Sequence, residues 1–206
     1  MNTHIEEKAY AKLNLSLDVV SKMPDGYHDL KMIFQSVSLY DSVEIDINDS
    51  GNIAVASNLG YLPGDASNIA VRAAKAFFDE IGSECGADLN LYKRIPGCAG
   101  LGGGSAVGAA VLRALNRHFG CPVDRERLIA IGRDIGSDVP FCIIGGTVLA
   151  RGRGDVMSEL PPIPDCDIVI CKPQFSISTP VLFKRIDCRR IRLRPDTDGI
   201  VSSIEA

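Results

Sequence analysis

The feature that most constrains this chain is a glycine-rich stretch between a strand and a helix. Residues 95–120 read "IPGCAGLGGGSAVGAAVLRALNRHFG". The alternating segment "ADLNLYKRI" before them predicts a strand, and a helix is expected from about Ser105 to His118, ending at Gly120. A flexible loop that leads into a helix N-terminus can turn backbone N–H groups toward an anion. A linker or a tight packing loop explains the glycines equally well at this point.

Two familiar phosphate-binding patterns do not fit these glycines. A Walker A loop requires a lysine after its last glycine, and none follows here. A dinucleotide fingerprint would need its third glycine at Ser105 or at Val107, depending on the starting glycine. What remains is an anion site built from backbone groups, in which Ser105 adds a hydroxyl or caps the helix.

The rest of the chain contains further segments that predict strands and helices. Residues 9–20 alternate, and their expected apolar face consists of Ala11, Leu13, Leu15, Leu17 and Val19. The turn "PDGYH" follows, then strands are expected near residues 30–37, 43–47 and 53–56. A helix is predicted over residues 67–82, capped by Ser67 or Asn68, and another begins near Asp124.

The C-terminal part suggests a second domain. The segment "GTVLARGRGDVMSEL" predicts a hairpin that turns on "GRG". "PPIP" at residues 161–164 is the best boundary, dividing the chain into domains 1–160 and 161–206. After it we expect a buried strand in "CDIVICKP", a helix with Thr179 as its cap, and a helix in "RPDTDGIVSSIEA". The chain stops as that last helix gains its apolar face, so we expect the second domain to be incomplete.

Charge and cysteine content narrow the class of protein. The net charge of -4, without a basic block, argues against nucleic acid and against a polybasic membrane anchor. No apolar run is long enough to span a bilayer, and the N-terminus lacks the features of a secretion signal. Seven cysteines without a CxxC pair predict buried free thiols in a cytoplasmic protein, and we expect no metal site among them.

Several sequence blocks together resemble one enzyme family. They are "AKLNL", "DGYH", "PGCAGLGGGSA", "GSDVPF" with the following "GGT" and "GRG", and "FSISTPVLF" with "RPDTDG". From Tyr10 to Gly199 the chain resembles the GHMP kinases, and among them most closely the branch that acts on a cytidyl-linked methylerythritol. The resemblance implies an α+β fold, with an N-terminal domain like ribosomal protein S5 domain 2, followed by the beginning of a ferredoxin-like domain.

The resemblance also implies an activity. It is the ATP- and Mg²⁺-dependent phosphorylation of the 2-hydroxyl of 4-diphosphocytidyl-2-C-methyl-D-erythritol, in the non-mevalonate route to isoprenoids. The expected partner is this small molecule, with no nucleic acid and no membrane, and the protein is expected to be a monomer or a weak homodimer.

Residue roles follow from the matching motif positions. Asp138 matches the catalytic base and Lys12 the active-site lysine that pairs with it, while Asn14 would orient the reacting hydroxyl. The cytidyl substrate would be held by Tyr27, His28, Thr179 and Phe183. ATP would be held by Asn68 and by the loop, which comprises Pro96, Gly97, Cys98, Ala99, Gly100, Leu101, Gly102, Gly103, Gly104, Ser105 and Ala106.

The residues alone also allow plainer interpretations. Asp138 before Val-Pro is a good helix cap, and Lys12 could lie on a solvated sheet face. His28 could belong to a surface loop, and Phe183 to a helix core. The family usually has glycine at the position of Cys98, serine at Ala106 and a polar residue at Val107. A kinase for another alcohol, or a nucleotide-binding module without turnover, therefore stay open as alternatives.

Overall fold

The computed structural model describes residues 4–173, 175, 179–188 and 191–206, with the side chains of residues 179 and 180 outside that description. The chain divides into two compact units. Unit 1 consists of Met1–Lys12, Ser36–Pro96 and Gly102–Gly145, and unit 2 of Leu13–Gln35, Gly97–Leu101 and Gly146–Ala206. The two longest strands, β1 (His4–Lys22) and β2 (His28–Asn48), contribute residues to both units.

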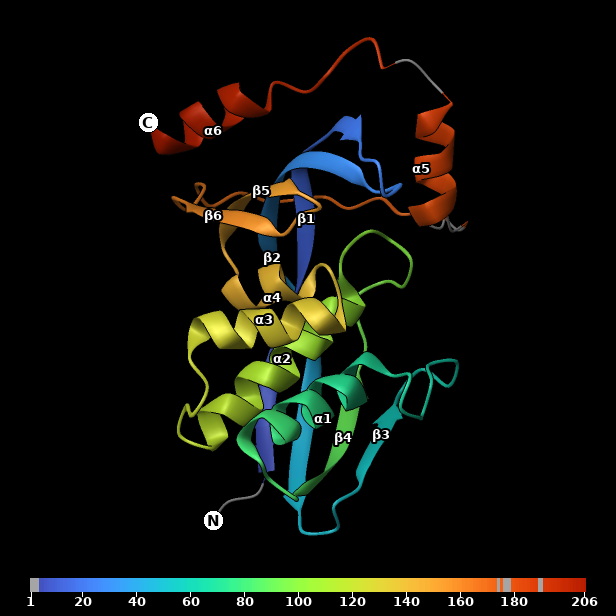
Figure 1. The fold of residues 1–206 in the computed structure, drawn as a ribbon, viewed down its shortest axis with the longest axis vertical. Coiled ribbons are helices and arrows are strands. Elements are labelled where there is room, and N and C mark those ends of the chain that lie inside the picture. Colours follow the sequence, from blue (N-terminus) through green and yellow to red (C-terminus); the bar gives the residue numbers. More distant parts are fainter. Residues whose placement is uncertain (1–3, 174, 176–178, 189–190) are drawn as a thin grey trace. The chain divides into compact units, whose positions relative to one another are not determined.

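In unit 1, helices cover one side of a small sheet (Figure 1). Strand β4 (Gly86–Tyr92) pairs antiparallel with the second half of β2 and parallel with β3 (Ile53–Ser57). The helices are α1 (Ile69–Ile81), α2 (Gly103–His118), α3 (Arg125–Ile135) and α4 (Val139–Ile144). The core between the two layers includes Ile45, Leu89, Phe77, Val111 and Leu115, all at most 1% exposed.

The helix ends in unit 1 follow the capping rules. The Asn68 side chain accepts a hydrogen bond from the Ala70 amide, and Gly82 closes α1 in the left-handed conformation, with φ of 64°. The Asp124 side chain accepts from the Arg127 amide at the start of α3. The predictions for these two helices are confirmed.

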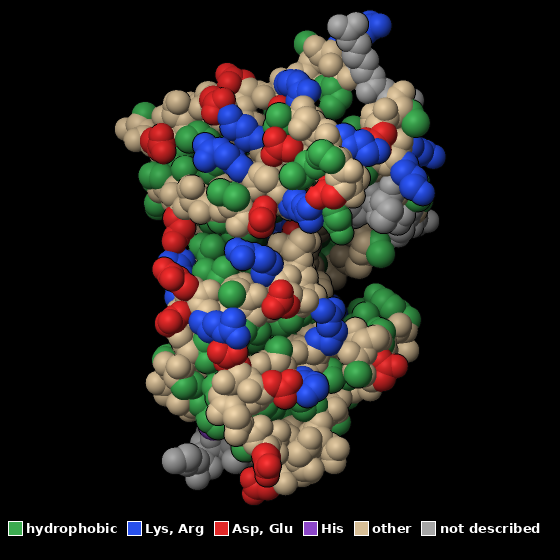
Figure 2. All heavy atoms as spheres, viewed as in Figure 1, with side chains coloured by type: hydrophobic (Ala, Val, Ile, Leu, Met, Phe, Trp, Pro, Cys, Tyr) green, Lys and Arg blue, Asp and Glu red, His purple; other side chains and the backbone are tan. Residues whose placement is uncertain are grey.

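In unit 2, the first half of β2 pairs antiparallel with β5 (Thr147–Gly152), and β5 pairs with β6 (Val156–Leu160). This confirms the predicted hairpin. Two helices follow, α5 (Thr179–Asp187) and α6 (Thr197–Glu205), and the Asp196 side chain caps the second. On the face drawn in Figure 2, acidic and basic side chains are interspersed, with no block of a single sign.

Three expectations about the strands were wrong. Residues 30–37 and 43–47 belong to one continuous strand of 21 residues, although Asp41 and Ser42 between them are residue types that favour turns. The Asp41 carboxylate instead accepts hydrogen bonds from the backbone of Arg94 and Ile95. Leu15 and Leu17 are 37% and 41% exposed, whereas Ser16 is buried, because its hydroxyl lies 2.6 Å from that of Thr197 on α6. The segment 166–173 is exposed and forms no strand, since it pairs with no strand in the described chain.

The cysteines also differ from expectation. All seven are free, but only Cys142 is buried, and five are exposed. Cys121 shows why apolar sequence neighbours mislead: it lies in the turn after α2 with φ of 59°, where its side chain faces solvent. No helix in the described part of the chain has both the length and the apolar character needed to cross a membrane.

Candidate active site

Lys12 and Asp138 form an ion pair in unit 1. The Lys12 Nζ lies 3.4 Å from Asp138 Oδ2, and the two side chains are 8% and 32% exposed. Asp138 occupies the position before α4, yet its side chain makes no capping hydrogen bond. The plainer interpretation of Asp138 as a helix cap is therefore wrong. Lys12 is not on a solvated face, because two other segments of unit 1 pack against its side chain. The expected pairing of the two residues is present.

One of those segments is the start of α2. Gly102 stands at the N-cap position with φ of 67°, and no side chain caps this helix, so Ser105 is not its cap. A Cβ added at Gly102 would lie 2.9 Å from Lys12 Cγ. Glycine is therefore needed here for its backbone conformation and for the close approach of Lys12. The first N–H groups of α2 have no intrahelical acceptor, and they carry the positive end of the helix dipole.

The preceding loop residues belong to unit 2. Gly97 and Cys98 are exposed, while Leu101 is buried; Pro96, the loop residue before them, is exposed and belongs to unit 1. Cys98 takes a left-handed conformation with φ of 52°, a conformation in which a residue with a Cβ is strained. Ala99 is half-buried, Gly100 is exposed with φ of 73°, and in unit 1 Gly103 is half-buried and Gly104 exposed.

Two departures from the family pattern lie inside α2. Ala106 and Val107 are each 1% exposed, so both side chains belong to the core of unit 1. Where the family has a hydroxyl and a polar group, this chain has apolar packing contacts. The two substitutions therefore affect the packing of α2, since neither side chain reaches solvent.

A buried ion pair that sequence reasoning missed anchors both ends of the glycine stretch in unit 1. Asp41 on β2 is fully buried and pairs with Lys93 Nζ. The Asp41 carboxylate also accepts from the backbone amides of Arg94 and Ile95, at 2.6 and 2.8 Å. Lys93 Nζ donates to the Gly103 carbonyl at 3.0 Å. The pair thus ties the end of β4 to the first residue of α2.

The other predicted ATP contact is Asn68. It is 6% exposed, and its Oδ1 accepts from the Ala70 amide at 2.9 Å. Its Nδ2 donates to the Pro63 carbonyl at 2.7 Å. Both ends of the amide therefore have protein partners, and Asn68 holds the loop before α1 against the helix start.

In unit 2, three of the predicted substrate residues lie on or near the turn before β2. Gly26 has φ of 87°, and the Tyr27 amide donates to Asp25 Oδ1 at 3.0 Å, so the predicted turn is confirmed. The Arg153 guanidinium carbon lies 4.2 Å from the centre of the exposed Tyr27 ring. The His28 ring stacks on Phe183 of α5, with centroids 4.6 Å apart.

Two further predicted residues can be placed only in part. Asn14 is half-buried, and its Nδ2 lies 3.7 Å from the Met32 sulfur. Thr179 is the first residue of α5, and its side chain lies outside the described residues.

Cys142 lies on α4, four residues after Asp138. Burial raises the pKa of its thiol to about 12, and the negative charge of Asp138 adds to the shift. The thiol is therefore neutral at physiological pH and unsuited to act as a nucleophile.

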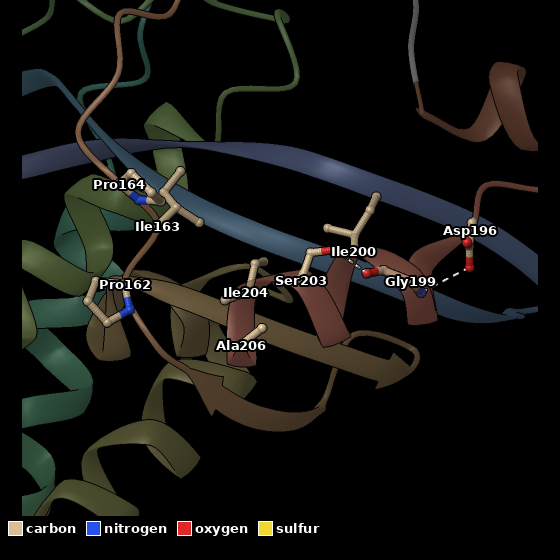
Figure 3. A pocket seen from close by; sticks show the side chains of 9 residues that line it. All are labelled: Pro162, Ile163, Pro164, Asp196, Gly199, Ile200, Ser203, Ile204 and Ala206. Carbon is tan, nitrogen blue, oxygen red and sulfur yellow. Dashed lines mark hydrogen bonds between the residues drawn. The ribbon is translucent and has the colours of Figure 1, made fainter.

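A separate hollow in unit 2 contains none of the predicted site residues (Figure 3). It lies between the segment around Ile163 and the apolar side of α6, where Ile200 and Ile204 point into it. Its lining offers few groups for binding a charged ligand, so we do not place chemistry there.

Comparison with known proteins identifies the family. Residues 68–146 match the model of the GHMP kinases N terminal domain. A 4-diphosphocytidyl-2-C-methyl-D-erythritol kinase of Caldicellulosiruptor saccharolyticus is 42% identical over 96% of this chain and 68% of its own length. The chain belongs to this branch of the GHMP kinases. The kinase of the same description from Clostridium acetobutylicum is 46% identical over 96% of this chain and 70% of its own length.

The fold agrees with that of the family. A crystal structure of 4-(cytidine 5'-diphospho)-2C-methyl-D-erythritol kinase matches with a TM-score of 0.75 at 30% identity, over 97% of this chain and 70% of that chain. The α+β architecture of the GHMP kinases, expected from the sequence blocks, is therefore confirmed. The boundary near residue 160 stays a prediction.

Proposed function

We propose that this chain transfers the γ-phosphoryl group of ATP to the 2-hydroxyl of 4-diphosphocytidyl-2-C-methyl-D-erythritol. The observation that carries the proposal is the Lys12–Asp138 pair beside the uncapped start of α2. It combines a carboxylate, a cation and a set of backbone N–H donors within unit 1. These are the groups that phosphoryl transfer to an alcohol requires.

Asp138 is proposed to act as the base. Its carboxylate accepts the proton of the substrate hydroxyl as that oxygen bonds to the γ-phosphorus. The bond between the γ-phosphorus and the bridging oxygen breaks, and ADP leaves with the electron pair. Lys12, paired with Asp138, stabilises negative charge on the transferring group. Asn14, two residues further along β1, would orient the hydroxyl.

The start of α2 fits a phosphate group. Its N–H groups are not used by a side-chain cap, and Gly102 lets the backbone turn without a Cβ. Asn68 and the loop from Pro96 to Ala106 are proposed to hold ATP. Mg²⁺ would neutralise charge on the triphosphate and would be held mainly by phosphate oxygens.

The cytidyl end of the substrate is assigned to unit 2. His28 would bond to the base, Tyr27 and Phe183 would contact its ring, and Thr179 would lie close by. These roles rest on matching motif positions and on the aromatic contacts described above. We further propose a cytoplasmic enzyme that acts as a monomer or weak homodimer.

The proposal is tested by measuring ADP release from ATP and Mg²⁺ with three acceptors: the cytidyl substrate, mevalonate and homoserine. We expect ADP release with the cytidyl substrate and none with mevalonate or homoserine. Turnover with either of the other alcohols instead would assign the chain to another GHMP activity. Binding of ATP without any turnover would favour the nucleotide-binding module.

A further inference from the structure

Helix α5 presents two side chains to the same histidine. Phe183 and Asp187 are four residues apart and therefore lie on one face of the helix. Phe183 stacks on the His28 ring at an interplanar angle of 30°. Asp187 Oδ1 lies 2.7 Å from His28 Nε2. The His28 side chain is only 10% exposed. Phe183 covers one face of its ring, and Asp187 binds one of its two nitrogens.

The carboxylate of Asp187 is itself held in the ionised form. Lys22 Nζ donates to Asp187 Oδ2 at 2.5 Å, so each carboxylate oxygen has a partner. The hydrogen bond from Lys22 lowers the pKa of Asp187 most, and the hydrogen bond from His28 lowers it further. An ionised carboxylate can only accept hydrogen bonds. His28 Nε2 must therefore carry the proton, and Nδ1 is the nitrogen left for a ligand.

We propose that Asp187 is a positioning residue that determines base specificity through His28. The inference depends on the proposed function only for the identity of the nucleobase, cytosine. In the tautomer with its single proton on Nε2, the ring carries a lone pair on Nδ1, which accepts a hydrogen bond. Cytosine offers an amino group on its pairing edge, whereas uracil offers a carbonyl oxygen in the same place. A fixed acceptor at Nδ1 therefore selects a cytidyl over a uridyl ligand.

The first test needs no substrate. Asp187→Asn is compared with wild type and with Asp198→Asn, a control that removes a different carboxylate–lysine pair of unit 2, the 2.5 Å contact with Lys31. Nitrogen NMR of the ring reports which nitrogen is protonated, and the chain has only three histidines to assign. We expect Nε2–H in wild type and in the control, and a mixture of forms in Asp187→Asn.

The second test separates binding from chemistry. Asp187→Asn should raise the KM for the cytidyl substrate by about 2- to 10-fold, as expected for weakening of one hydrogen bond between neutral groups. It should leave kcat and the KM for ATP within about twofold, and reduce the preference for cytidine over uridine diphosphate in binding titrations. Asp187→Glu should restore part of the preference. The control should match wild type in each respect.

Two outcomes would overturn the inference. One is an Asp187→Asn variant whose ring-nitrogen signals and base preference equal those of wild type. The other is a variant that loses kcat and the affinity for both substrates together with its thermal stability, which would indicate a folding role. If wild type shows no turnover at all, the proposed function fails, while the NMR and diphosphate titrations still decide the role of Asp187.

Discussion

Replacing Gly102 with alanine should damage catalysis through Lys12 and not merely through stability. The added Cβ would lie 2.9 Å from Lys12 Cγ, whereas unstrained carbon contacts are about 3.5–4.0 Å. The Lys12 side chain must therefore move by roughly 0.6–1 Å, which disturbs its 3.4 Å contact with Asp138. A displacement of about 1 Å in a catalytic group can lower the rate by about 10²-fold.

The backbone at Gly102 adds a second effect, on stability. Its φ of 67° is left-handed, and alanine in that conformation costs about 1–2 kcal/mol. For a chain of this size, that corresponds to a decrease in Tm of about 2–8 °C. The matched control is Gly120→Ala, just past the other end of α2, where φ is 80° and no atom lies within 4 Å of the added Cβ. Gly120→Ala should lose the stability that this backbone conformation costs, and Gly102→Ala at least as much.

The assay is steady-state ADP release, measured well below the Tm of either variant. Gly102→Ala should lower kcat by about 10- to 100-fold relative to Gly120→Ala, which should retain wild-type kcat. If both variants have the same kcat at equal folded fraction, the close approach of Gly102 to Lys12 has no catalytic role, and the reasoning is refuted.

Three further predictions concern stability and thiol chemistry. Asp41→Asn should lower the free energy of unfolding by about 3–5 kcal/mol, because it removes the carboxylate that pairs with the buried Lys93 side chain; a denaturant titration with a change below 1 kcal/mol would contradict this. Cys98→Gly should raise that free energy by up to about 1 kcal/mol, since glycine relieves the left-handed strain, and an unchanged denaturation midpoint would count against it. Above pH 9 the unfolded chain ionises Cys142 while the fold keeps it protonated up to about pH 12. The stability of wild type relative to Cys142→Ala should therefore be constant below pH 9 and fall above it by about 1.4 kcal/mol per pH unit; parallel pH profiles would disprove the shift.

The sequence predicts the local elements of this fold well where one local rule decides them. Asn68 and Asp124 cap their helices as expected, and the hairpin turns where "GRG" allows it. The long strand β2 was missed because a continuous strand and two shorter ones share the same alternation. The exposed segment 166–173 was misjudged because a strand also needs a partner, which an apolar pattern does not specify.

For the site, motif positions selected Lys12 and Asp138, and the plainer interpretations of both were wrong for tertiary reasons. The plainer interpretation placed Lys12 on a solvated face of the sheet. In the structure, Gly102 and Asp138 cover that side of β1. The Asp41–Lys93 pair left a signal that could have been used. Asp41 is in phase with the buried Val43 and Ile45 of β2, and Lys93 continues the buried phase of Leu91. A charged residue on an apolar phase implies a buried partner. Nothing in the sequence, by contrast, indicates that Asp187 contacts His28, since 159 residues separate them.

The most direct test of the account is the turnover of Asp138→Asn with ATP and the cytidyl substrate. Asparagine keeps the shape of the side chain but cannot accept the proton of the hydroxyl, so kcat should fall by about 10²- to 10⁴-fold. ATP affinity, measured by calorimetry on the same preparation, should remain within a few-fold of wild type. Wild-type turnover in this variant would contradict the assignment of Asp138 as the base, and with it the central claim.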